Sequence, residues 1–175
     1  MDAFFADGRV LDGDELIVIQ AGANDSSAAL AARNIGGHIA TLVAAGGKAF
    51  LVPGESRLSQ DPDNAGSPRY WDRFVADFNT ELKKQLDALE AQFNITLFRF
   101  DVLALQDDMI ANPAKYGLVN VTDPGCPDCV PIPPPNAADT IVPNPDQYMY
   151  WDGAHFTAAV QKIIGGAAAD LVLRK

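Results

Sequence analysis

Two short segments of the sequence hold the side chains best suited to acid–base chemistry. Residues 151–155 read Trp-Asp-Gly-Ala-His, which places the carboxylate of Asp152 three positions before the imidazole of His155. In a turn, a carboxylate at this spacing can reach Nδ1 of the ring, fix its tautomer and stabilise its charged form. The same spacing also fits an aspartate that caps the next helix beside a surface histidine, and both interpretations remain open at this point.

The second segment is the turn at residues 22–25, Gly-Ala-Asn-Asp, which directly follows an apolar run. Gly22 suits a tight turn, and the side-chain amide of Asn24 could there donate to a developing oxyanion, a contribution of about 3–4 kcal/mol to catalysis. The alternative is an ordinary strand-to-helix turn in which Asn24 and Asp25 cap the helix. The only other histidine, His38, lies in the middle of a predicted helix, and we expect it to be structural.

An alternation of strands and helices must position these segments. Short apolar runs rich in β-branched residues predict three strands buried on both faces, at residues 16–20, 48–52 and 95–100. Helical spacing of apolar residues predicts four helices, from Asp25 or Ser26 to about 43, and over about 69–93, 101–110 and 156–173. The Pro- and Gly-rich stretch 112–147 is predicted to be irregular and to cover a site.

This order of elements predicts one α/β domain over residues 1–175, with a parallel sheet covered on both faces. Ligands bind such sheets at the carboxyl edge, where the turn at residues 22–25 leaves the first strand. Three strands make a thin sheet with unpaired edges. We therefore expect the chain to form homo-oligomers through these edges.

Composition narrows the possible partners. A net charge of −10 argues against nucleic acid, which needs a basic surface. No apolar run is long enough to span a membrane, and the N-terminus lacks the basic flank of a secretory signal.

Cys126 and Cys129 are expected to form a local disulfide or to be two inert thiols. No metal site is expected, because two thiolates would need two further ligands and the sequence has two histidines.

Together, G-x-N-D after the first strand and D-x-x-H before the last helix resemble motifs of the SGNH (GDSL) family of ester hydrolases. Residues 112–122, followed by Cys126, are similar to the N-P-x-x-Y-G-F-x-N-V-T…C passage of the lipase/esterase branch, and residues 148–152 resemble its Y-x-F-W-D passage. Residues 2–7 and the first strand resemble the helix and strand before the third motif block. Pro53 and Gly54 stand where members have a Leu-Pro-Asp-Leu turn. The resemblance covers essentially the whole chain.

The resemblance implies a three-layer, flavodoxin-like α/β fold that hydrolyses small carboxylic esters through an acyl-enzyme, without metal or organic cofactor. It implies that Asn24, with Gly22, forms part of the oxyanion hole. His155 would be the general base, and Asp152 the acid that orients it. The resemblance and the cysteine pair also favour an exported parent protein, although this chain shows no leader.

The sequence departs from the family at the nucleophile. The family uses the serine of a Gly-Asp-Ser motif that precedes G-x-N-D by many tens of residues, whereas 21 residues precede Gly22 here. We therefore expect an N-terminally incomplete member of about three strands. Ser26, near Asn24, is our candidate for a replacement nucleophile, although it also fits a helix cap; Ser56 and Ser59 are further candidates. The alternatives are a composite site made by associated chains and a non-catalytic remnant that binds acyl or glycan ligands.

Overall fold

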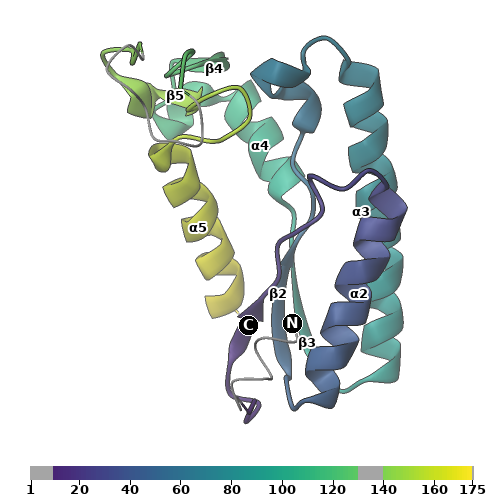
Figure 1. The fold of residues 1–175 in the computed structure, drawn as a ribbon. Coiled ribbons are helices and arrows are strands. Elements are labelled where there is room, and N and C mark those ends of the chain that lie inside the picture. The colour runs from purple at the N-terminus through teal and green to yellow at the C-terminus, as the bar shows by residue number, and fades with distance from the viewer. Residues whose placement is uncertain (1–9, 130–139, 175) are drawn as a thin grey trace. The chain divides into compact units, whose positions relative to one another are not determined.

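The computed structural model describes residues 10–129 and 140–174, and these form two compact units (Figure 1). The first unit contains the described residues up to Glu55, together with Phe74–Asp101 and Arg174; the second contains Ser56–Arg73 and Val102–Leu173. The segment at residues 2–7, for which a helix is implied by the family resemblance, lies outside the described residues. So do residues 130–139 of the predicted loop.

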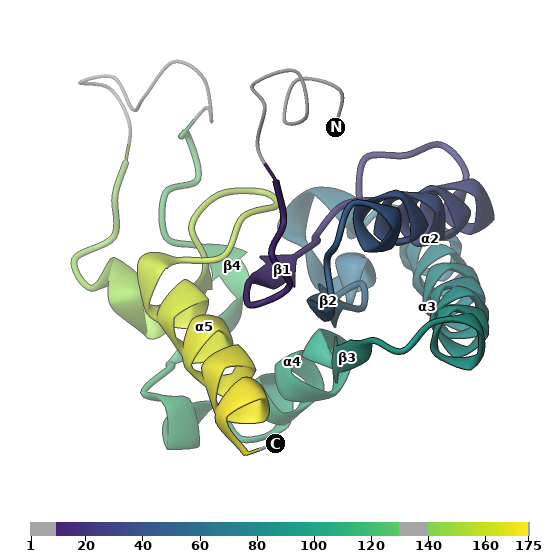
Figure 2. The same cartoon turned by 90° about the horizontal axis from the view of Figure 1, so that it is seen from below.

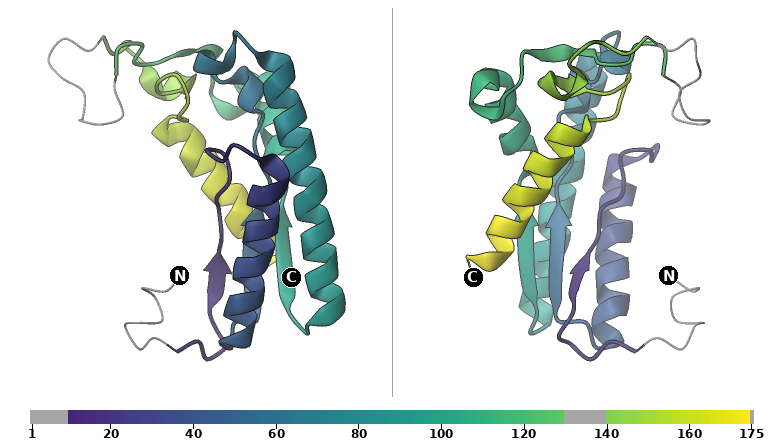
Figure 3. Two further views of the ribbon diagram at one scale, coloured as in Figure 1. Left: turned by 45° about the vertical axis from the view of Figure 1, so that its right-hand side comes forward. Right: turned by 90° about the vertical axis from the view of Figure 1, so that its left-hand side faces the viewer.

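The first unit contains a parallel sheet of three strands in the order β1–β2–β3. Its strands are β1 (Leu16–Val18), β2 (Ala49–Pro53) and β3 (Thr96–Phe100). Phe50 of β2 stands opposite Ile17 of β1 and Leu97 of β3, and the arrows in Figure 3 point the same way. The three strands predicted from the sequence, and the parallel α/β class, are therefore confirmed.

Strand β1 differs from the prediction of a strand buried on both faces. Its Leu16 and Val18 side chains are 41% and 59% exposed. Within the described residues β1 pairs with β2 alone and so forms an edge of the sheet. An edge strand has a neighbour on one side only, which leaves part of its apolar surface open. A run of apolar residues alone does not distinguish such an edge from a central strand.

Two helices lie side by side on one face of this sheet (Figures 1 and 2), α2 (Ala28–Ala44) and α3 (Pro68–Gln92). The buried side chains of α3 recur at helical spacing, as predicted: Phe74, Val75, Phe78, Leu82, Leu86 and Leu89. The predicted cap of α2 was wrong, because the cap is Ser27, not Asp25 or Ser26. The Ser27 side chain accepts a hydrogen bond from the N–H of Leu30 at 3.4 Å.

The second unit holds α4 (Val102–Ala111), β4 (Asn120–Pro124), β5 (Tyr148–Tyr150) and α5 (Ala158–Leu173). Strands β4 and β5 pair in parallel, so the prediction that residues 112–147 are irregular was wrong for β4. Short 3-10 helices at Pro113–Tyr116 and Pro145–Gln147 flank this strand pair. The buried core joins both helices to the strands through Met109, Leu118, Met149, Tyr150 and Val160.

A disulfide joins Cys126 to Cys129 just after β4, which decides between the two possibilities left open by the sequence. Cys126 is fully buried, and its backbone N–H donates to the carbonyl of Trp151 at 2.7 Å. The disulfide loop is thereby tied to the segment that contains Asp152 and His155.

The described residues, 10–129 and 140–174, show neither a helix that could span a membrane nor a cluster of metal-ligating side chains. None of the helices described there is long and apolar enough to cross a membrane. Nor do those residues contain a group of three or more His, Cys, Asp or Glu side chains placed to hold a metal ion.

Candidate active site

The Asp152–His155 pair predicted from the sequence is formed in the structure. Nδ1 of His155 lies 3.0 Å from Oδ1 and 2.9 Å from Oδ2 of Asp152. An ionised carboxylate only accepts hydrogen bonds, so Nδ1 must carry the ring proton in this contact. The lone pair of a neutral imidazole is then on Nε2, which is the arrangement that a general base requires.

Asp152 is buried but remains well supplied with hydrogen-bond donors. Its Oδ1 accepts from the backbone N–H of Ala154 at 2.9 Å and from that of His155 at 2.8 Å. Burial by itself raises the pKa of the Asp152 carboxyl, yet these N–H groups and the imidazole together hold that pKa below its ordinary value. The carboxylate therefore stays ionised at neutral pH. Its side chain is 7% exposed and that of His155 63%, so the imidazole is open to solvent.

The turn that carries the pair is closed at its base. The N–H of Trp151 donates to the carbonyl of His155 at 2.7 Å, and Tyr150 and Phe156 form an antiparallel bridge on either side. Gly153, inside the turn, accepts from the N–H of Asp63 at 2.9 Å through its carbonyl. A Cβ on Gly153 would collide with the Asp63 carboxyl, so glycine permits this approach.

The predicted oxyanion segment also forms a turn. The N–H of Asp25 donates to the carbonyl of Gly22 at 3.0 Å, and Gly22 has a φ of 118°. A Cβ at Gly22 would stand 2.5 Å from Cε2 of Phe78 in α3, so both the backbone and the packing require glycine. Asn24 is exposed in this turn.

We predict that Gly22→Ala destabilises the protein by about 1–3 kcal/mol, because alanine is strained at this φ and its methyl group collides with Phe78. The urea unfolding midpoint measures the change. Gly37→Ala is the matched control: Gly37 lies in α2 with nothing within 4 Å of its Cβ position. There alanine should leave stability unchanged or raise it by up to about 1 kcal/mol. Equal midpoints for Gly22→Ala and wild type would contradict this account of the turn.

The candidate serines differ in their surroundings. Ser26 is exposed, and the neighbouring Ser27 occupies the helix cap. Ser59 is buried and donates its hydroxyl to Asp72 at 2.6 Å, a structural use that leaves it poorly placed for attack. Ser56 is half-buried at the start of the second unit. His38 is exposed on α2, and a structural role for it stays a prediction.

The candidate residues are divided between the two units. Gly22, Asn24 and Ser26 belong to the first unit, whereas Asp152 and His155 belong to the second. The structure thus forms the acid–base pair and, separately, the turn of Asn24. Their convergence on one substrate stays a prediction.

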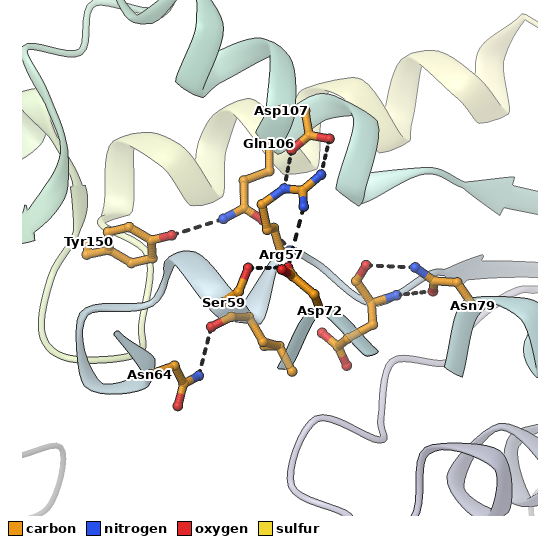
Figure 4. Close-up of polar contacts among 10 residues, drawn as sticks. Arg57, Ser59, Asn64, Asp72, Asn79, Gln106, Asp107 and Tyr150 are labelled. Carbon is orange, nitrogen blue, oxygen red and sulfur yellow. Dashed lines mark hydrogen bonds and ion pairs between the residues drawn. The ribbon is translucent and has the colours of Figure 1, made fainter. Parts of the chain in front are cut away.

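Sequence reasoning missed a polar network in the second unit (Figure 4). The guanidinium of Arg57 pairs with Asp107 at 2.5 and 2.6 Å, and its backbone N–H donates to the side chain of Gln106 at 2.6 Å. Gln106 in turn donates to the hydroxyl of Tyr150 at 3.0 Å. Its partners lie 44 and 49 positions away, so no local spacing could reveal them. The one available signal is a glutamine on the apolar face of α4.

Comparisons with known proteins agree with this geometry. Residues 4–168 match the model of the GDSL-like lipase/acylhydrolase family. A GDSL esterase/lipase of Arabidopsis thaliana is 31% identical over 140 residues, which cover 70% of this chain and 34% of that protein. GDSL esterase/lipase 7 of the same plant is 26% identical over 132 residues, which cover 70% of this chain and 35% of that protein. The chain thus spans about a third of the length of these relatives. On the family match over nearly its whole length, the chain belongs to the GDSL-like lipase/acylhydrolase family, and its predicted three-layer α/β fold is that of the family.

Proposed function

We propose that this chain hydrolyses carboxylic esters by serine-type chemistry, with Asp152 and His155 as its acid–base pair. The observation that carries the proposal is the contact of the His155 Nδ1 with the buried, ionised Asp152. It fixes the imidazole so that Nε2 can accept the proton of an attacking hydroxyl and later give it to the leaving alcohol. The family to which the chain belongs supports the same reaction.

Asn24 is proposed to stabilise the oxyanion that forms on the ester carbonyl. Its turn is shaped by Gly22, which leaves the Asn24 side chain exposed at the end of β1. A positioned amide donor of this kind typically contributes about a hundredfold to a thousandfold in kcat. This role requires the amide to reach the same substrate as His155.

Ser26 is the chain's own candidate for the nucleophile. The sequence has no Gly-Asp-Ser string, and Ser26 is an exposed hydroxyl two positions after Asn24 that is not the helix cap. In the proposed reaction its Oγ attacks the ester carbonyl and releases the alcohol. Water then cleaves the resulting acyl-enzyme. Small esters with short acyl groups are the proposed substrates, and the charge of −10 argues against a nucleic-acid partner.

A fluorophosphonate probe tests this assignment, because it reacts covalently with an activated serine. We expect mass spectrometry to find the label on Ser26. We also expect the unlabelled protein to hydrolyse a short p-nitrophenyl ester, and labelling to abolish this activity. A label on Ser56 would reassign the nucleophile within the same chemistry. If the protein shows neither labelling nor turnover, the esterase proposal is refuted. A chain that only binds acyl or glycan ligands is then favoured. His155→Ala, which removes the base, is the control for activated labelling.

We also propose that the chain associates with itself along β1. Leu16 and Val18 expose apolar surface, and within the described residues β1 pairs with β2 alone, a combination that favours pairing of its other edge with another strand. Sedimentation velocity should show an oligomer that Val18→Lys reduces to monomer. Leu30→Lys is the matched control, since Leu30 is 50% exposed but belongs to helix α2 and not to the edge strand. A wild-type chain that sediments as a monomer at high concentration would refute the proposal.

A further inference from the structure

Three buried side chains of the second unit form a polar chain that ends two residues before Asp152. Gln106 is fully buried and uses both ends of its amide: Oε1 accepts from the N–H of Arg57, and Nε2 donates to the hydroxyl of Tyr150. The same hydroxyl is hydrogen-bonded to the side chain of Asp61. Asp61 is 5% exposed and Tyr150 fully buried.

This arrangement leaves the Tyr150 hydroxyl little freedom. The hydroxyl accepts one hydrogen bond and donates another, and a carboxylate can only be the acceptor of the second. Each of the three buried groups would lose a partner if the hydroxyl moved, and an unpaired buried polar group is costly. The phenol ring is therefore held at its far end by two side chains from different segments.

The ring and backbone of Tyr150 contact the base of the turn that contains Asp152 and His155. Its ring stacks on that of Phe156, with centroids 5.5 Å apart, and the two residues also form the backbone bridge at the base of the turn. The Tyr150 carbonyl accepts from the N–H of Gly125 at 2.8 Å, on the side of β4. A shift of Tyr150 would thus move both ends of the segment between it and Phe156.

We propose that Tyr150, held by Asp61 and Gln106, is a positioning residue for the imidazole of His155. The proposal rests on the esterase function proposed above, and Tyr150 acts through the turn without touching substrate. Losing its hydroxyl leaves the aromatic core in place but releases the ring from its two polar partners. The contact between His155 and Asp152, which fixes the tautomer, is then no longer held in one geometry.

The test is the tautomer of His155, read from ¹⁵N chemical shifts of the imidazoles above the pH at which they protonate. In the wild-type chain we expect the proton on Nδ1. In Tyr150→Phe we expect the signals to shift toward a mixture of the two tautomers. Gln106→Met removes the amide that donates to the Tyr150 hydroxyl, and we expect it to shift the His155 signals in the same way. This second variant keeps the test decisive if the first fails to fold. Near-UV circular dichroism reports whether the second unit keeps its fold, because His38, the only other histidine, is exposed in the first unit.

Tyr116→Phe is the matched control, because Tyr116 also donates its hydroxyl to an aspartate, Asp108, in the same unit. It should leave the His155 signals unchanged. In ester hydrolysis, Tyr150→Phe should lower kcat by about tenfold to a hundredfold at unchanged KM, since misalignment affects the reacting geometry more than binding. Tyr116→Phe should not change kcat.

The outcomes separate this inference from the function on which it rests. If the wild-type His155 carries its proton on Nε2, the acid–base pair itself is refuted, and the positioning role with it. If the wild type shows the Nδ1 tautomer and a folded Tyr150→Phe shows the same signals, only the positioning role is overturned. An equal loss of kcat in Tyr116→Phe would likewise overturn it, since the effect would then be general to the unit.

Discussion

Replacing His155 with alanine should lower kcat for ester hydrolysis by about a millionfold, to the residual rate that substrate binding and the oxyanion donor still provide. The proposed reaction passes every proton through the Nε2 of this ring, first from the nucleophile and then to the leaving alcohol. Alanine offers no replacement acceptor, and the carboxylate of Asp152 loses its contact with the imidazole. The rate of p-nitrophenolate release from a short ester measures the loss.

His38→Ala is the matched control for this prediction, because it removes the other imidazole, from the exposed side of α2. It should leave the rate within a factor of about two of wild type. The rate should also fall as the pH is lowered through the range in which imidazoles titrate, roughly pH 5 to 8, because a protonated ring cannot accept a proton. Retention of activity in His155→Ala, or a flat profile over this range, would remove His155 from the mechanism.

The parts of the fold that the sequence predicted are those set by local patterns. Strands β2 and β3 are short runs of β-branched and aromatic residues, and α3 repeats apolar residues at helical spacing, so each carries its signal within its own segment. Strand β4 is missed because Asn120–Pro124 contains few apolar residues and pairs with a strand more than twenty positions away. The exposure of β1 depends on what lies beside it, which its own sequence does not contain.

In the candidate site, too, contacts within one short segment were predicted and contacts between distant segments were missed. Asp152 and His155 were found because they lie three positions apart in a single turn, and the contact depends on little else. The three groups that support this turn, Asp61, Gln106 and Tyr150, come from separate segments and meet only in the folded unit. The capping role of Ser27 was assigned to Asp25 or Ser26 because adjacent capping residues satisfy the same local rule, and the path of the backbone decides among them.

Asp152→Asn should lower kcat by about ten-thousandfold while leaving the fold nearly unchanged. Oδ1 of Asp152 accepts the N–H groups of Ala154 and His155, and an asparagine carbonyl can accept both in the same position. The second oxygen, which lies 2.9 Å from the His155 Nδ1, becomes an NH₂ group. NH₂ only donates, and the retained carbonyl oxygen, although 3.0 Å from Nδ1, already accepts two backbone N–H groups. We therefore expect Nδ1 to become the acceptor and the ring proton to move to Nε2, where the base is needed.

The pKa of Asp152 gives this prediction a second measurable consequence. A carboxyl whose pKa is lower in the folded than in the unfolded protein stabilises the fold above about pH 3.9, and that stability is lost as the pH falls through the folded pKa. An asparagine side chain does not titrate, so the Asp152→Asn variant should lose less stability than wild type on acidification. Asp63→Asn is the control, because it makes the same change in an exposed carboxyl beside Gly153. Turnover of Asp152→Asn within tenfold of wild type would mean that the tautomer of His155 does not limit the reaction.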